Sequence, residues 1–158
     1  MSRMRLPLLS LTLGVLVSTC GGSGGPTSAT DPGNDDDPGN PGGGTRVIKA
    51  NPSFAADIVE IFVRRSCTLS SCHGGGDGEL TLTASASTNY GNLVAVQSPS
   101  SGVVRVIPYD AANSYLVKKL EGTQGSGNGE RMPLMLSPLD NIDITNIKNW
   151  INAGAPNN

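Results

Sequence analysis

A helical alternation of apolar and polar residues begins directly after residues 51–53, where an asparagine, a proline and a serine supply capping and first-turn signals. Over residues 54–66, apolar side chains such as Ile58 and Phe62 recur three or four positions apart, and the acidic residues fall outside this stripe. The pattern predicts an amphipathic helix that buries one face and delivers the chain to Cys67.

Two further segments carry helix signals. Residues 113–121 begin with two candidate caps, Asn113 and Ser114, and end before a glycine that can stop the helix. Residues 140–154 place three isoleucines on one face and close with a glycine that precedes a proline. Both segments are therefore predicted to be helices, and the second has the stronger signals.

The remaining residues favour loops over regular elements. Glycine-rich connections occupy residues 74–78 and 122–133. Residues 80–108 contain strand-forming runs, LTLT and VVRVI, which we interpret as extended lining with a short ladder at most. The chain is therefore predicted to be all-α, with about three helices joined by long Gly-rich loops.

Composition adds one constraint to this picture. Residues 46–158 are enough for one small domain and too few for two. Aromatic residues make up only 4% of the chain, so the apolar core is expected to be thin for its length. Such a domain would gain stability from a large buried cofactor or a cross-link.

The N-terminus has the order of a secretory signal. Arg3 and Arg5 precede an apolar run at 6–17 that is too short to span a bilayer, and small residues lead to Cys20. This ending resembles the lipobox of bacterial lipoproteins, which implies a signal peptide over 1–19 and lipidation of Cys20. An ordinary secretory signal, with a different cleavage site, is the alternative.

Residues 20–45 are rich in glycine, proline and aspartate and repeat the tetrapeptide DPGN, so we expect a disordered tether. Loss of the signal would leave nine basic against 13 acidic residues, a net charge of −4. An acidic chain without a basic cluster is a poor candidate for nucleic-acid binding. The predicted location is the cell envelope, periplasmic or lipid-anchored at the outer membrane.

Three reactive side chains lie close together in the sequence: Cys67, Cys72 and His73. They form a C-x4-C-H motif that contains the only histidine of the chain. A c-type haem needs two thiols for its vinyl groups and a histidine directly after the second thiol, usually as C-x-x-C-H. The motif departs from that spacing by two residues, but it keeps the adjacency of Cys72 and His73.

Other interpretations of the motif stay open at this point. In an exported protein, two nearby cysteines most often form a disulfide, and four intervening residues can close such a loop. A structural zinc site would need further carboxylate or water ligands, which is unusual.

Residues elsewhere in the chain, taken together with this motif, resemble a known family. In order and spacing, residues from about 54 to 155 resemble bacterial monohaem cytochrome c domains of the kind appended to exported proteins. Members with four residues between the cysteines are part of this family. The matching residues are Ile61, Phe62, Cys67, Cys72 and His73; Pro108, Asn113, Ser114, Tyr115 and Leu116; Arg131, Met132 and Pro133; and Trp150, Ile151, Gly154 and Ala155.

The resemblance implies a small cytochrome c-like fold around one covalent haem c. Cys67 and Cys72 would carry the thioethers, and His73 would be the proximal ligand of the iron. With a single histidine, two histidine ligands within one monomer are excluded. By resemblance the sixth ligand is Met132, with Met135 as the rival.

The same resemblance implies Arg131 and Tyr115 as contacts of the haem propionates. It implies a one-electron carrier, not an enzyme, that exchanges electrons with redox partner proteins as a monomer. Two alternatives remain: a haem-free lipoprotein binding module with a Cys67–Cys72 disulfide, and a five-coordinate haem that binds gas or reduces peroxide.

Overall fold

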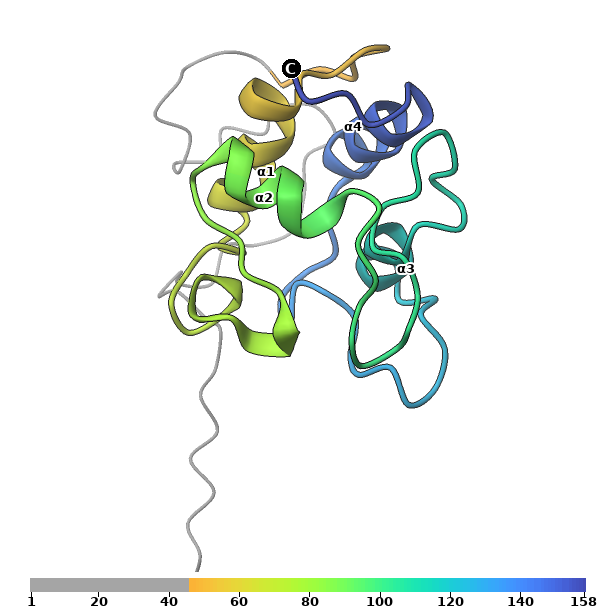
Figure 1. The fold of residues 1–158 in the computed structure, drawn as a ribbon. Helices are drawn as coiled ribbons and strands as arrows, with labels where there is room; N and C mark the ends of the chain where they lie inside the picture. The colour runs from red at the N-terminus through yellow and green to blue at the C-terminus, as the bar shows by residue number, and fades with distance from the viewer. Residues whose placement is uncertain (1–45) are drawn as a thin grey trace, which may run out of the picture.

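The computed structural model describes residues 46–158, so the predicted signal peptide, the tether and Cys20 lie outside the described residues. Within the described range the protein is helical and has no strand, as predicted (Figure 1). The only ladder contacts in this range are two isolated bridges, Val94 with Val106 and Gln97 with Val104. The elements are a π-helical turn η1 (Phe54–Ile58), helices α1 (Val59–Arg64), α2 (Ala86–Leu93), α3 (Tyr115–Glu121) and α4 (Asn141–Asn152), and the 3₁₀ turns η2 (His73–Gly75) and η3 (Asp77–Glu79).

The first predicted helix is present as η1 followed by α1. Its N-terminus is capped by Ser53, whose Oγ accepts a hydrogen bond from the backbone N–H of Ala56 at 3.3 Å. Asn158, at the other end of the sequence, caps the same turn: its backbone oxygen accepts from Ala55 N at 2.9 Å, and its Oδ1 accepts from Phe54 N at 2.8 Å. The N–H groups that a helix start leaves unpaired are thereby satisfied.

The two later predicted helices also form. Ser114 is the N-cap of α3, and Gly122 follows that helix in the left-handed conformation, with φ of 76°. Asp140 is the N-cap of α4, and its Oδ1 accepts from Asp143 N at 2.9 Å. The caps therefore lie where the sequence indicated them.

Helix α2 was not predicted, because residues 80–108 were interpreted as extended lining. Its sequence, ASTNYGNL, is rich in serine, threonine, asparagine and glycine, which disfavour helix interiors. Tertiary contacts outweigh this low propensity: Leu93 is fully buried, and Tyr90 donates its hydroxyl to Ala155 O at 2.9 Å. A helix of this composition gives little periodic signal in the sequence.

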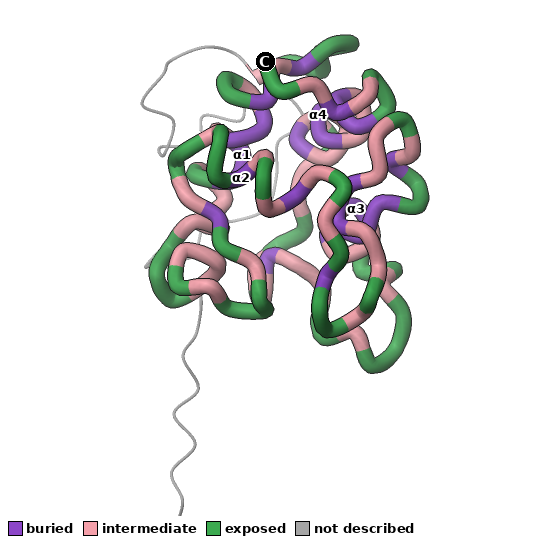
Figure 2. Tube along the Cα trace, viewed as in Figure 1, coloured by how far each residue is buried: buried purple, intermediate pink, exposed green. Residues whose placement is uncertain are grey.

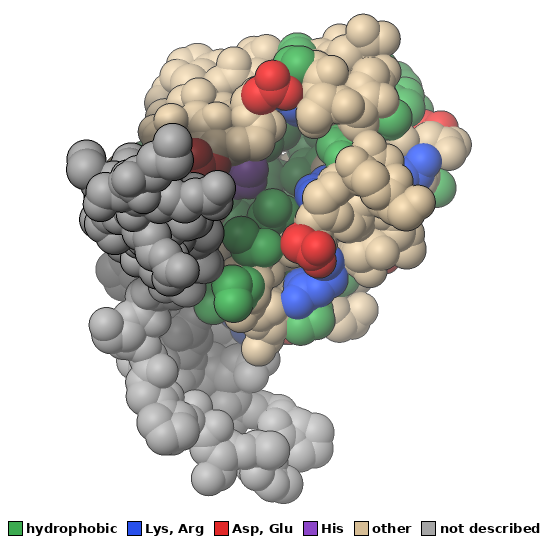
Figure 3. Space-filling model, turned by 90° about the horizontal axis from the view of Figure 1, so that it is seen from below, with side chains coloured by type: hydrophobic (Ala, Val, Ile, Leu, Met, Phe, Trp, Pro, Cys, Tyr) green, Lys and Arg blue, Asp and Glu red, His purple; other side chains and the backbone are tan. Residues whose placement is uncertain are grey.

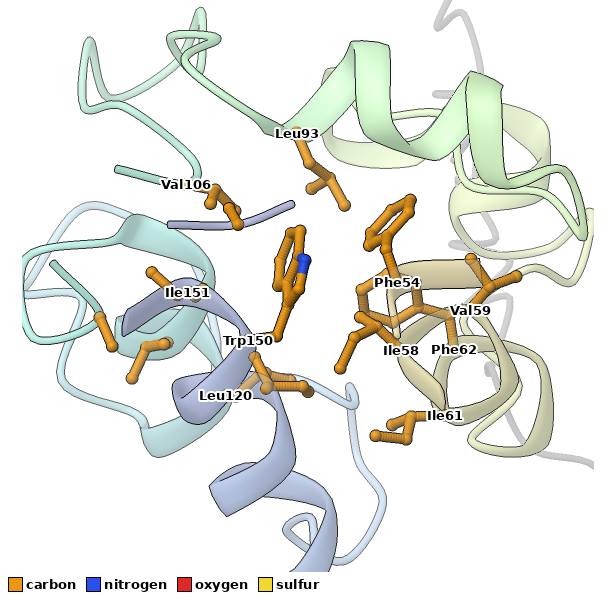
Figure 4. Close-up of a cluster of buried hydrophobic side chains, with 14 of the residues drawn as sticks. Phe54, Ile58, Val59, Ile61, Phe62, Leu93, Val106, Leu120, Trp150 and Ile151 are labelled. Atoms are coloured by element: carbon orange, nitrogen blue, oxygen red, sulfur yellow. The ribbon is translucent and has the colours of Figure 1, made fainter. Parts of the chain in front are cut away.

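The core lies where η1, continued by α1, packs against α4 (Figures 2 and 4). The fully buried Trp150 of α4 stacks on Phe54, with ring centroids 4.8 Å apart, and Tyr90 contacts Phe54 edge-on at 5.4 Å. The indole Nε1 donates to Pro156 O at 2.9 Å, so no polar atom of Trp150 is buried without a partner. This aromatic group fixes α4 against η1.

A buried ion cluster joins the same two helices. The side chain of Asp143, only 2% exposed, accepts from Arg64 of α1 at 2.7 Å and from Arg46 at 3.1 Å. Arg64 is itself 4% exposed and pairs with Glu60 at 2.7 Å. The cluster holds the end of α1, three residues before Cys67, against the start of α4.

One carboxylate of this cluster, Asp140, makes the free energy of unfolding depend on pH. Burial alone would raise the pKa of Asp140, but hydrogen bonds from the Asp143 N–H and from Arg46 hold that pKa below its usual value. A depressed pKa in the folded state stabilises the protein above the unfolded-state value of about 4, and this stabilisation is lost as the pH falls through the folded-state pKa.

We therefore expect Asp140→Asn to lower the free energy of unfolding at neutral pH and to reduce its decline in acid. Urea unfolding between neutral pH and about pH 2 would measure both effects. Asp77→Asn, at an exposed aspartate, is the control. An Asp140→Asn profile parallel to that of the wild type would contradict the expectation.

Candidate functional site

One cavity of about 450 Å³ gathers side chains from segments that are distant in the sequence. Its walls are largely apolar and come from α1, α3, the segment after the C-x4-C-H motif and the loop that precedes α4. Four of the predicted site residues, Cys67, His73, Tyr115 and Met132, line this one cavity. Figure 3 shows the hollow, with the histidine and hydrophobic side chains inside it and charged side chains at its rim.

The imidazole of His73 is held in one orientation. Its Nδ1 lies 2.7 Å from the backbone oxygen of Asp77, four residues on. A carbonyl oxygen only accepts, so Nδ1 carries the proton and donates it, which leaves the lone pair on Nε2. Metal-binding histidines commonly have this arrangement, because the second hydrogen bond fixes the tautomer and the ring.

The two cysteines of the motif differ in position. Cys67 is a free thiol on the cavity wall, and burial raises its pKa to about 11 despite the opposing effect of Arg65. Cys72 does not line the cavity. Because Cys67 is a free thiol, this structure does not contain the Cys67–Cys72 disulfide of the alternative.

The residues between the two cysteines form a closed turn. Leu69 O accepts from the backbone N–H groups of both Cys72 and Gly74, each at 2.9 Å. The turn leaves no room beside the glycines: a Cβ on Gly74 would lie 2.2 Å from Thr68 O, and one on Gly75 would lie 2.2 Å from Ser70 O. The C-x4-C-H motif contains two residues more than C-x-x-C-H. This turn accommodates them directly before His73.

Alanine at two glycines of the chain should have opposite effects. Gly74→Ala forces the backbone of the turn apart, and we expect it to lower the free energy of unfolding by about 1–3 kcal/mol. Gly91, inside α2, has no atom near its missing side chain, so Gly91→Ala should stabilise by about 0.5–1 kcal/mol. Chemical denaturation compares the pair, and equal effects would contradict the close packing of the turn.

The two candidate methionines lie in different places. Met132 is partly buried, packs against the core and lines the cavity, and its backbone N–H donates to Lys119 O at 2.8 Å. Met135 is 74% exposed, is not part of the cavity lining and has a φ of 57°. Met132 therefore lines the same cavity as His73, whereas Met135 does not.

The two residues implied as propionate contacts also separate. Tyr115 lines the cavity, and its hydroxyl donates to Asn128 O at 3.3 Å. Arg131 is not part of the lining, and its guanidinium donates to Met132 O at 3.2 Å and to Leu136 O at 2.6 Å. In this structure Arg131 therefore braces the backbone around Met132.

The sequence interpretation missed two cationic residues of the cavity wall, Arg105 and Lys119. Arg105 is 7% exposed, and Lys119 donates through Nζ to the backbone oxygens of Asn128, at 3.0 Å, and Glu130. The signal for Arg105 was a single arginine inside the apolar run VVRVI. Nothing in the sequence distinguishes Lys119 from a surface lysine of α3.

A comparison of this chain with protein-family models, with curated proteins and with solved structures found no significant match. Among residues 46–158, no helix has the length and apolarity needed to cross a membrane. In the same range, no group of three His, Cys, Asp or Glu side chains is arranged to hold a metal ion. The function therefore has to be argued from the cavity itself.

Proposed function

We propose that this protein is an exported monohaem c-type cytochrome that carries single electrons. The observation that supports this function best is the convergence of Cys67, His73 and Met132 on one largely apolar cavity. These residues come from three separate parts of the domain, and they are a thiol, an imidazole and a thioether, which are the groups that c-type haem uses.

The residues present fit such a group. The thiols of Cys67 and Cys72 would hold it covalently, each with its sulfur bonded to one vinyl carbon and its hydrogen transferred to the other carbon. This addition needs no oxidant, but it does need both cysteines as thiols.

His73 and Met132 would be the two protein ligands of the iron, and this pair favours electron transfer. His73 would offer Nε2, because Asp77 O holds the proton on Nδ1. Met132 would offer a soft sulfur, which favours ferrous iron and raises the reduction potential. A bound haem would supply a one-electron couple, and the apolar walls would keep water away from it. Because the protein would supply both ligands, no position would remain for a substrate, so we propose a carrier and not an enzyme.

The remaining parts of the proposal concern location and partners. The lipobox-like ending at Cys20 supports a lipid anchor, and the Gly/Pro/Asp-rich segment that follows it supports a tether at the cell envelope. The partners would be redox proteins that exchange electrons with a monomer, and the acidic charge balance gives no support for a nucleic-acid partner.

The test is to produce the full chain with its own export signal in a host that attaches c-type haem. We expect sharp low-spin visible bands on reduction, and colour that stays with the protein after extraction with acidified acetone. A colourless product would contradict the proposal, provided that a control protein with a C-x4-C-H motif matures in the same host.

The largely apolar cavity also suits one competing function, a haem-free envelope protein that binds an apolar ligand there. Alkylation of the protein from the haem-attaching host separates the two functions. If Cys72 becomes reactive after treatment with a dithiol, the haem-free protein is supported. If both cysteines stay unreactive after reduction, they are held as thioethers.

A further inference from the structure

Arg105 is a charged side chain buried in the wall of an apolar cavity. It is 7% exposed and lines the same cavity as His73 and Met132. Its guanidinium donates through Nη1 to Asn92 O at 3.0 Å and through Nη2 to Glu79 O at 2.6 Å. These bonds hold the guanidinium between α2 and η3, so its place in the wall is fixed.

Both of these acceptors are neutral backbone oxygens, so the charge of Arg105 is not neutralised by them. Among the described residues, no carboxylate forms an ion pair with Arg105. Burial lowers the pKa of Arg105, and the carboxylate of the exposed Glu79 only partly offsets this effect. A buried guanidinium without an anion is costly, because desolvation is compensated only by a paired charge.

The second cation of the wall is in a different position. Lys119 donates to two backbone oxygens, and the carboxylate of Glu130, which also lines the cavity, counteracts the effect of burial on the pKa of Lys119. Lys119 therefore has an acidic neighbour at the cavity and also holds the loop in place. Arg105 is the more deeply buried of the two cations, and Glu79 lies outside the cavity lining, so among the described residues the charge of Arg105 has no counter-charge of its own inside the cavity.

We infer that Arg105 binds a carboxylate of the molecule that occupies the cavity, so that the occupant is an amphipathic acid with an apolar body. A guanidinium suits this task because it keeps its charge when buried and presents several N–H donors in a plane. The inference deepens the proposed function and, where it concerns haem, rests on it: the carboxylate is then a propionate. It assigns the anion contact to Arg105 in place of Arg131.

The test uses mesoporphyrin and its dimethyl ester as a matched pair of probes. Mesoporphyrin has ethyl groups in place of vinyl groups, so it cannot form thioethers, and the ester lacks only the two negative charges. Both are titrated into the full chain purified from cells without haem-attachment machinery. We expect the acid to bind about tenfold more tightly than the ester, because a charged hydrogen-bonded pair contributes that much.

Variants of Arg105 and Arg131 test which arginine causes the preference for the acid over the ester. Arg105→Met should bind acid and ester equally, and Arg105→Lys should keep part of the preference. Arg131→Met is the matched control, because that arginine also donates to two backbone oxygens but lies outside the cavity lining; it should keep the full preference. Far-UV circular dichroism and thermal unfolding confirm that each variant is folded.

A second pair, dodecanoate and dodecanol, separates the inference from the haem proposal. If neither porphyrin binds, but dodecanoate is preferred and Arg105→Met removes that preference, the anion site stands, and covalent colour in the haem-attaching host decides the haem function separately. If the porphyrins bind without any preference, or if the preference survives Arg105→Met, the anion site is overturned, whatever the result of that haem-attachment test. If neither pair shows a preference that depends on Arg105, the inference is wrong.

Discussion

Replacing Met132 with alanine in the haem-loaded protein is expected to lower the reduction potential by on the order of 0.1 V, within the range of about 0.8 V over which axial ligands tune haem. The reduced visible spectrum should change at the same time, because the iron of the proposed haem would lose its sulfur ligand. The reason is the position of Met132, which lines the cavity that contains His73.

Met135→Ala is the matched control. Met135 is 74% exposed and three residues away in the same loop, so its loss should leave both the potential and the spectrum unchanged. If Met132→Ala leaves both unchanged as well, Met132 is not a ligand. The five-coordinate haem would then be the better hypothesis, and binding of carbon monoxide without ligand displacement would support it.

Replacing Asp143 with alanine should give the largest loss of stability in the described part of the protein, about 3–5 kcal/mol in the free energy of unfolding. The side chains of Asp143 and Arg64 are 2% and 4% exposed, so the variant leaves a buried guanidinium with one carboxylate fewer. Urea denaturation monitored by circular dichroism measures the effect.

Glu121→Ala is the control for a surface pair. Glu121 and Lys148 are 38% and 37% exposed, and such pairs contribute about 1 kcal/mol or less. The double variant Arg64→Met, Asp143→Leu should recover much of the stability, because apolar side chains replace a buried pair at little cost. A single Asp143→Ala variant that is no less stable than Glu121→Ala would show that the cluster contributes little.

The sequence predicted the elements whose signals are local. The apolar spacing before Cys67 and the caps Ser114 and Asp140 each act within a few residues, so they identified α1, α3 and α4. Helix α2 could not be predicted in this way, because its polar residues become helical only through long-range contacts such as Tyr90 with Ala155. Propensity alone is a weak guide in such a segment.

The site shows the same division. The C-x4-C-H motif marked Cys67 and His73, and the structure brings both to one cavity with Met132. Which methionine faces that cavity depends on the path of the loop after Arg131, and the spacing does not encode this path. Arg105 was missed because the sequence shows only a single arginine in the apolar run VVRVI. Its burial in the cavity wall becomes visible only in the structure.

The cap that Asn158 provides to the first helical turn ties the two ends of the domain into one cooperative unit. Opening of the turn at Phe54 and Ala55 and release of the residues that follow α4 must occur together, because each is the hydrogen-bond partner of the other. Ends that would otherwise fray separately thus share one opening event. We therefore expect local opening to occur first in the loops, some of which form part of the cavity wall.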